Sequence, residues 1–278
     1  MKFAGIIAEY DPFHNGHAWQ LAQAKALGAE RVAVAMSCSL VQRGALPLLP
    51  EAVRTRSALT CGADLVFALP APCACAGAEA FARAGVALLA AAGCDGLVFG
   101  AETPDAALLM EAAELLDSDS YRAALKAQLA GGARSFAAAR QTAAAQLASD
   151  ERVAALLDKP NNNLAVEYCR AIRSLAPRME AYPLPRQGAN HGEALHSAHG
   201  QFASASALRK LWAEGGADAV APYVPEAVFP LYQEAYAAGQ YTDFSAAGRC
   251  ELALLRSACR GKAPFADIRG VSEGLEHR

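Results

Sequence analysis

The chain has 278 residues, 54% of them hydrophobic and 19% charged, and it carries a net charge of −3 at pH 7. This composition supplies a large packed core and excludes a disordered chain or a collagen-like fibre. No apolar run approaches the ~20 residues that a membrane-spanning helix needs, and the first residues resemble a strand instead of a signal peptide, so we expect a cytoplasmic protein without a membrane partner.

Strands and helices alternate along the first hundred residues. Apolar and β-branched runs predict strands, and helical patterns separate them. The strands are expected at residues 3–8, 31–36, 64–69 and 96–99, and the helices at residues 18–27, 50–61 and 76–92. Because strand, helix and strand in this rhythm are typical of right-handed βαβ units, the sequence predicts a doubly wound α/β fold around a parallel sheet.

The middle of the chain is helical without an intervening strand, which predicts an inserted helical subdomain. Its helical patterns lie at residues 105–116, 120–129, 135–147 and 150–157. Another helix is expected after Asn163, to about Leu175, and an extended segment at residues 178–185 is expected to return to the sheet as its last strand.

The C-terminal part of the chain starts with a helix N-cap signal. Ser204 and Ser206 precede a helical pattern through Trp212, and the Pro-punctuated stretch beyond Gly215 predicts short helices. We therefore expect one α/β domain at residues 1–213, with the helical insertion at about residues 105–157, and a helical appendage at residues 214–278.

Basic residues are spread along the chain instead of forming a block. Examples are Arg31, Arg54, Arg56 and Arg140, and we expect most of them to be ordinary solvated charges. Since the net charge is acidic, any contact with RNA must come from a local patch, which the sequence does not locate.

The eight cysteines and the clustered histidines favour no metal or disulfide framework. Most cysteines lie in apolar or helical contexts, and the pair Cys73 and Cys75 has neither zinc nor redox spacing. His191, His196 and His199 invite a metal hypothesis, but their segment offers a single carboxylate to complete a shell. We expect no metal held by protein side chains alone.

The turn at residues 9–17 is the most informative segment. It joins the first strand to the first helix, at the edge of the sheet where open α/β folds bind ligands. It holds neither a dinucleotide fingerprint nor a phosphate loop with a lysine, but places His14 and His17 on either side of Gly16. Imidazole N–H donors at a helix N-terminus suit a polyphosphate that gains charge during displacement. The alternative is that one histidine caps the helix and the other is solvated.

Several strings occur in one order along nearly the whole chain. They are Ile7-Ala8-Glu9-Tyr10-Asp11-Pro12-Phe13-His14-Asn15-Gly16-His17, Met36-Ser37 with Val41-Gln42-Arg43-Gly44, Gly62-Ala63-Asp64-Leu65-Val66, Phe99-Gly100-Ala101-Glu102, Lys159-Pro160-Asn161-Asn162, Ser204-Ala205-Ser206-Ala207-Leu208-Arg209 and Glu273-Gly274-Leu275-Glu276-His277-Arg278. Together they resemble the tRNA(Met) cytidine acetate ligase family of the His-x-Gly-His nucleotidyltransferase superfamily. The resemblance implies a Rossmann-like nucleotidyltransferase domain. It also implies activation of acetate by ATP to acetyl-adenylate, and acetyl transfer to the wobble cytidine of elongator tRNA(Met).

The resemblance also implies roles for individual residues. His14 and His17 would be catalytic, and Mg²⁺ would be bound through the ATP phosphates. The residues implied for ATP are Ile7, Ala8, Glu9, Tyr10, Pro12, Phe13, Asn15, Gly16, Gln20, Gly100, Asn161, Asn162, Arg186, Ser204, Ser206 and Arg209. Arg43 is a further candidate for phosphate or substrate. Without the resemblance, the Asn residues and Ser204 could be plain helix N-caps, and Arg43 and Arg186 solvated cations.

The chain departs from the family pattern around the expected site. Asp11 stands where Asn is usual, Cys38-Ser39-Leu40 replaces a Gly-Asn-Phe-like string, Ala52 stands where a Lys is common, and Ala68 replaces a Glu. Members commonly continue through a basic helical segment, whereas this chain stops at Arg278, so we expect a truncated or shortened relative. Two other functions stay open, namely a small-molecule nucleotidyltransferase and a catalytically weakened ATP-binding homologue.

Overall fold

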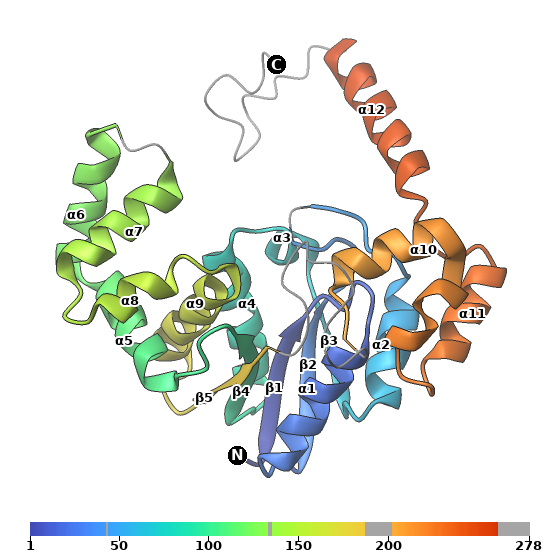
Figure 1. The fold of residues 1–278 in the computed structure, drawn as a ribbon, viewed down its shortest axis with the longest axis horizontal. Helices are drawn as coiled ribbons and strands as arrows, with labels where there is room; N and C mark the ends of the chain where they lie inside the picture. Colours follow the sequence, from blue (N-terminus) through green and yellow to red (C-terminus); the bar gives the residue numbers. More distant parts are fainter. Residues whose placement is uncertain (43, 133–134, 187–201, 261–278) are drawn as a thin grey trace. The chain divides into compact units, whose positions relative to one another are not determined.

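A computed structural model of the chain describes residues 1–42, 44–132, 135–186 and 202–260. Its centre is a sheet of five parallel strands in the order β3-β2-β1-β4-β5 (Figure 1). The strands are β1 (Phe3–Ala8), β2 (Arg31–Ser37), β3 (Leu65–Leu69), β4 (Gly96–Ala101) and β5 (Glu180–Pro185). The chain builds outward from β1 to β3 and then returns to β4 on the other side, so the predicted doubly wound fold is confirmed, with a topological switch point between β1 and β4.

The helices in chain order are α1 (Asn15–Ala26), α2 (Glu51–Thr60), α3 (Ala71–Ala74), α4 (Ala78–Ala91), α5 (Ala106–Asp117), α6 (Asp119–Ala130), α7 (Phe136–Leu147), α8 (Glu151–Leu156), α9 (Pro160–Leu175), α10 (Ala205–Val220), the 3-10 helix η1 (Ala221–Tyr223), α11 (Phe229–Ala237) and α12 (Phe244–Arg260). Helices α5 to α8 form the predicted helical insertion between β4 and β5, and the described residues of this stretch contain no strand.

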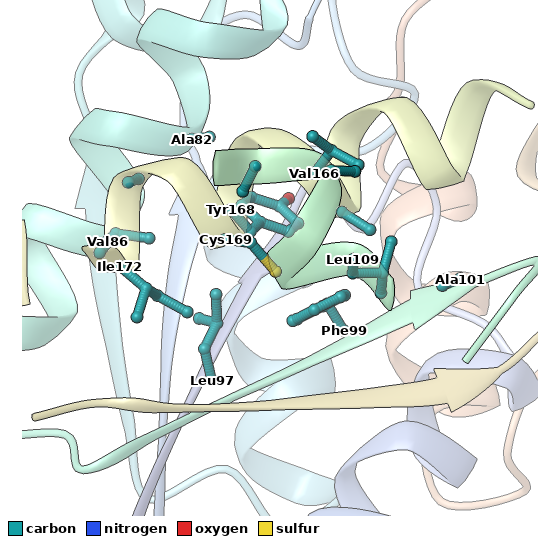
Figure 2. Close-up of a cluster of buried hydrophobic side chains, with 14 of the residues drawn as sticks. Ala82, Val86, Leu97, Phe99, Ala101, Leu109, Val166, Tyr168, Cys169 and Ile172 are labelled. Carbon is teal, nitrogen blue, oxygen red and sulfur yellow. The ribbon is translucent and has the colours of Figure 1, made fainter. Parts of the chain in front are cut away.

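Alternating side chains of the strands divide the core into two layers. Ala33 and Ala35 of β2 belong to one cluster, and Val34 and Met36 belong to the other. In the first cluster, side chains of β4 pack on α4 and α9, as Figure 2 shows for Leu97 and Phe99 beside Tyr168, Cys169 and Ile172. The second cluster joins the opposite face to α1, α2, α10 and α11.

Two helices begin earlier than the sequence pattern predicts, and both starts lie beside candidate site residues. Helix α1 begins at Asn15 instead of residue 18, because His14 caps it. Helix α9 begins at Pro160 instead of after Asn163, with proline in the first turn, where its missing N–H costs nothing. Asn161 and Asn162 therefore lie inside the first turn, and neither is the N-cap.

The chain divides into two compact units, Met1–Tyr241 and Thr242–Arg278, and α12 belongs to the second. Residue 213, the predicted domain boundary, lies within α10, and the assignment of domains by function stays a prediction.

In the described ranges, every helix is too short or too polar to cross a bilayer.

Candidate active site

The two histidines of the first turn hold each other's main chain. Nδ1 of His14 accepts the N–H of Gly16 at 3.1 Å, and Nδ1 of His17 accepts the N–H of His14 at 3.3 Å. This is a capping box built from two imidazoles, whose rings stack with centroids 3.8 Å apart. Because each neutral ring accepts through Nδ1, it carries its proton on Nε2, so the pair presents two N–H donors.

Burial keeps both imidazoles neutral. It lowers the pKa of His14 to about 4, and the nearby cation of Arg186 adds to this effect. The pKa of His17 also falls well below its usual value, through burial and through the charges of His14 and Arg186. The site therefore holds neutral imidazole donors beside a permanent cation at pH 7.

Gly16 is required by the stacked histidines. A Cβ at this position would lie 2.9 Å from Cε1 and 3.1 Å from Nδ1 of the His14 ring. Any side chain would therefore push the capping ring aside. The glycine thus has a local reason within the turn.

A second group of polar side chains lies at the start of α9. Glu102, directly after β4, accepts the main-chain N–H groups of Asn161 at 3.2 Å and Asn162 at 2.7 Å, so its carboxylate satisfies the helix N-terminus. The carboxamide of Asn161 donates to Glu102 at 2.6 Å and accepts from Arg186 at 2.5 Å. These hydrogen bonds, from Glu102 through Asn161 to Arg186, thus join β4, α9 and the end of β5.

Asn162 points elsewhere and is buried. Its Oδ1 accepts the N–H of Thr103 at 2.9 Å, and its Nδ2 donates to the Thr103 hydroxyl at 3.1 Å. The buried carboxamide of Asn162 thus has Thr103 as its partner, whereas Asn161 is only half-buried and lies beside Arg186. The structure thus separates two residues that the sequence pattern left equivalent.

The start of α10 meets the first turn through an ion pair. Ser204 caps α10, accepting the N–H of Ala207 at 3.3 Å and lying 3.1 Å from the Ser206 hydroxyl. Arg209, one turn further, donates to the Asp11 carbonyl at 2.6 Å and to its carboxylate at 3.1 Å. Ser204 is therefore an N-cap, as the alternative interpretation expected. The helix that it caps also lies beside the candidate turn.

The other candidate residues fall into three groups. Gln20 donates to the Val98 carbonyl at 3.1 Å across the switch point, and a Cβ at Gly100 would lie 3.5 Å from Cγ of Arg186. Tyr10 and Phe13, in contrast, bury their rings in the core, where both rings lie beside that of His17. The remaining candidates have local roles. Ile7 and Ala8 end β1, and Pro12 lies buried within the turn. Glu9 accepts the Gln42 N–H at 2.6 Å, and Asn15 donates to the Pro222 carbonyl at 3.3 Å.

The expectation that most of the basic residues are solvated has an exception. Arg54 is not solvated but fully buried, and it is the largest such side chain among the described residues. Its position on the buried stripe of α2, next to Val53 and one turn before Ser57 and Ala58, is the sequence signal that could have revealed it. Arg43, His191, His196, His199 and the string at residues 273–278 lie outside the described residues.

The chain is similar over its whole length to known proteins. A family model described as HIGH Nucleotidyl Transferase matches residues 1–278. A relative from Caldanaerobacter subterraneus, named tRNA(Met) cytidine acetate ligase, is 34% identical over 100% of this chain and 69% of its own length. This chain belongs to the tRNA(Met) cytidine acetate ligase family of HIGH nucleotidyl transferases. A relative of the same name from Syntrophotalea carbinolica is 36% identical over 100% of this chain and 65% of its own length.

Solved structures of the family have the same fold. Thermotoga maritima TmcAL bound with alpha-thio ATP matches with a TM-score of 0.85 at 31% identity, over 100% of this chain and 66% of that one. The apo form of the same protein matches with a TM-score of 0.87. This family member thus spans about two thirds of the length of its curated and solved relatives.

Proposed function

We propose that the chain carries the activity for which its relatives are named, the ATP-dependent acetylation of the wobble cytidine in elongator tRNA(Met). The observation that carries the proposal is the stacked, neutral pair His14 and His17 at the start of α1, with both Nε2–H groups left for a ligand. Its place at the carboxyl edge of a parallel sheet, next to Arg186, suits a triphosphate.

The first half-reaction joins acetate to AMP. A carboxylate oxygen of acetate attacks the α-phosphorus of ATP, a new O–P bond forms, and the bond to the β-phosphate bridging oxygen breaks to release pyrophosphate. Negative charge grows on the phosphate oxygens along this path, and the two imidazole N–H donors with the Arg186 guanidinium stabilise it without giving up a proton. The protein needs no nucleophile of its own for this step.

The second half-reaction forms the amide. The exocyclic amine of cytidine attacks the acetyl carbonyl carbon, a C–N bond forms, and the C–O bond to AMP breaks. The amine loses a proton to solvent, and AMP leaves with the electron pair of the broken C–O bond. The same N–H donors are placed to stabilise the departing phosphate.

The nucleotide would be bound by main chain and by few side chains. The turn after β1 contributes Ile7 to Gly16, with Gln20 behind it, and Gly100 offers backbone without a side chain. Between the two asparagines we assign the contact to Asn161, because its carboxamide lies beside Arg186, whereas that of Asn162 is used by Thr103. Ser204, Ser206 and Arg209 form the second phosphate-binding group.

Mg²⁺ would be held by the phosphate oxygens of ATP. The described part of the chain contains no group of three His, Cys, Asp or Glu side chains that could bind a metal. Acetate, ATP and elongator tRNA(Met) are the proposed substrates, and the cytoplasm is the proposed location.

The test follows acetyl-adenylate with α-labelled ATP and acetylated cytidine with labelled acetate. Wild-type protein is expected to form acetyl-adenylate only with acetate, and acetylated cytidine only when elongator tRNA(Met) is added. His14→Ala should slow adenylate formation by about 10²-fold, the loss typical of one donor to developing charge. Gln23→Ala, further along α1, serves as the matched control and should retain the wild-type rate.

Each other result selects a different function. Adenylate without acetylated cytidine would favour a small-molecule nucleotidyltransferase. ATP binding without pyrophosphate release would favour the non-catalytic homologue. Full adenylate formation by His14→Ala would contradict the assignment of the catalytic turn.

A further inference from the structure

Arg54 of α2 binds the main chain of three separate segments. Nε donates to the Leu49 carbonyl at 3.0 Å, and Nη1 donates to the carbonyls of Glu9 and Ser37, both at 2.7 Å. Nη2 donates to the carbonyl of Cys38. All of these acceptors are main-chain oxygens, so the buried guanidinium acts as a cross-link between backbone segments.

Two of these segments are the carboxyl ends of neighbouring strands. The ladder between β1 and β2 runs from Phe3 and Arg31 to the pair Ala8 and Met36. Beyond this pair, Arg54 donates hydrogen bonds to the carbonyl of Glu9 after one strand and to those of Ser37 and Cys38 at the end of the other. It therefore holds the strand ends together where their own pairing stops.

The link continues from Glu9 into the catalytic turn. Tyr10, the next residue, has φ of 50°, a left-handed conformation that costs energy for a residue with a side chain. Its buried ring lies edge-on to His17, with centroids 4.8 Å apart, and to Phe13 at 4.9 Å. The position of the Glu9 carbonyl thus decides where Tyr10, and through it His17, can lie.

The same turn is held from the other side by Asp11. Its carboxylate accepts the N–H of Leu48 at 2.5 Å, next to the Leu49 carbonyl that Arg54 holds. Asp11 and Arg54 therefore bind adjacent residues of one buried segment, and the segment joins the two polar side chains. This geometry requires the planar guanidinium, whose N–H donors point in several directions. A lysine ammonium cannot reach all of these carbonyls at once.

We propose that Arg54 is a positioning residue, which fixes the carboxyl ends of β1 and β2 and thereby holds the histidine pair in the geometry needed for adenylate formation. The proposal rests on the proposed function, because it deepens the role of the same turn. Arg54 touches no substrate in this account, and it acts through Glu9 and Tyr10.

The test compares Arg54→Lys and Arg54→Gln with Arg56→Lys, a matched control on the same helix. The side chain of Arg56 is 59% exposed and forms a surface ion pair with Glu234 at 3.7 Å. For Arg54→Lys we expect kcat for acetate-dependent pyrophosphate release to fall by about 10²-fold, as for a displacement of about 1 Å, with KM for ATP little changed. Arg56→Lys should leave both constants unchanged.

A spectroscopic readout separates positioning from loss of stability. Long-range ¹H–¹⁵N spectra report the imidazole tautomers, and spectra of His14→Gln and His17→Gln assign the two signals. Wild-type protein and Arg56→Lys should show the Nε2–H tautomer for both rings, and Arg54→Lys should show a mixture, because the caps at Nδ1 loosen.

A wild-type kcat in Arg54→Lys would overturn the proposal. A fall in kcat that parallels a fall in the thermal midpoint, with unchanged imidazole signals, would also overturn it. So would failure of both Arg54 variants to fold. Either result would assign Arg54 to stability alone. If wild-type protein forms no adenylate, the proposed function is wrong, and the imidazole signals still decide whether Arg54 holds the histidines.

Discussion

Each ring nitrogen of the histidine pair has its own task. Nδ1 of His14 and of His17 accepts a main-chain N–H and so begins α1, while Nε2–H is the donor that we propose for a ligand. Protonation would place a hydrogen on Nδ1 and remove both caps. The neutral state is therefore required by the helix, and the proposed chemistry uses the same state.

This coupling predicts a pH dependence of stability. The pKa of His14 is about 4 in the folded chain and 6.5 when unperturbed. Between these values the unfolded state binds more protons than the folded state, so the free energy of unfolding rises with pH. The contribution of His14 to this free energy is complete above about pH 6.5 and is lost as pH falls toward about 4. Urea unfolding of wild-type protein at pH 5 and pH 7 should show this difference, and His14→Gln should show a smaller one.

The comparison between the two proteins isolates the histidine, because the carboxylates titrate equally in both. An identical change between pH 5 and pH 7 in wild-type protein and His14→Gln would mean that His14 is not neutralised by folding. His17, whose pKa is lowered too, supplies the dependence that remains in the variant.

At the scale of elements, α9 connects the helical insertion to the sheet through buried charge. Glu167 of α9 is 3% exposed and accepts from Arg140 of α7 and, at 2.7 Å, from Arg170. Arg170 also donates to Asp117, at the end of α5, at 2.8 Å. One carboxylate thus lies between two arginines at the contact of three helices.

We expect Glu167→Ala to lower the free energy of unfolding by about 3 kcal/mol, because the two arginines lose the carboxylate that offsets their desolvation. Asp119→Ala removes an exposed pair with Arg122 and should cost less than about 1 kcal/mol. Urea unfolding followed by circular dichroism measures both. Equal losses in the two variants would show that the buried network adds nothing beyond a surface ion pair.

The elements themselves were largely predictable from the sequence, whereas their beginnings near the site were not. β1, with its run of apolar residues, was predicted with the bounds that the structure shows, because its pattern is local. The start of α9 depends on Glu102, a residue 59 positions earlier that no local pattern connects to it. The start of α1 depends on imidazole caps, which are not among the usual N-cap residues.

The candidate site, too, was predictable from the sequence only in part. The histidine turn could be recognised from spacing alone, since His14, Gly16 and His17 are adjacent in sequence. The hydrogen-bond partners of Arg54 could not, because they come from three segments that meet only in the folded chain. Likewise, only the fold separates Asn161 from Asn162, through their different neighbours Arg186 and Thr103.

At the scale of the molecule, every described candidate residue belongs to the compact unit Met1–Tyr241. We therefore expect a chain of residues 1–241 to fold and to bind ATP with the dissociation constant of the full chain. Isothermal titration calorimetry on both chains measures this, with circular dichroism to establish folding. A folded 1–241 chain that does not bind ATP would show that residues after Tyr241 contribute to the nucleotide site.

The histidine turn follows the middle strand of the sheet. β1 pairs with β2 along six residues and with β4 at Ala4 and Gly5, so an amide hydrogen bonded to a neighbouring strand exchanges with solvent only when that neighbour separates. The histidines therefore follow a strand whose exposure to solvent water requires the centre of the sheet to open.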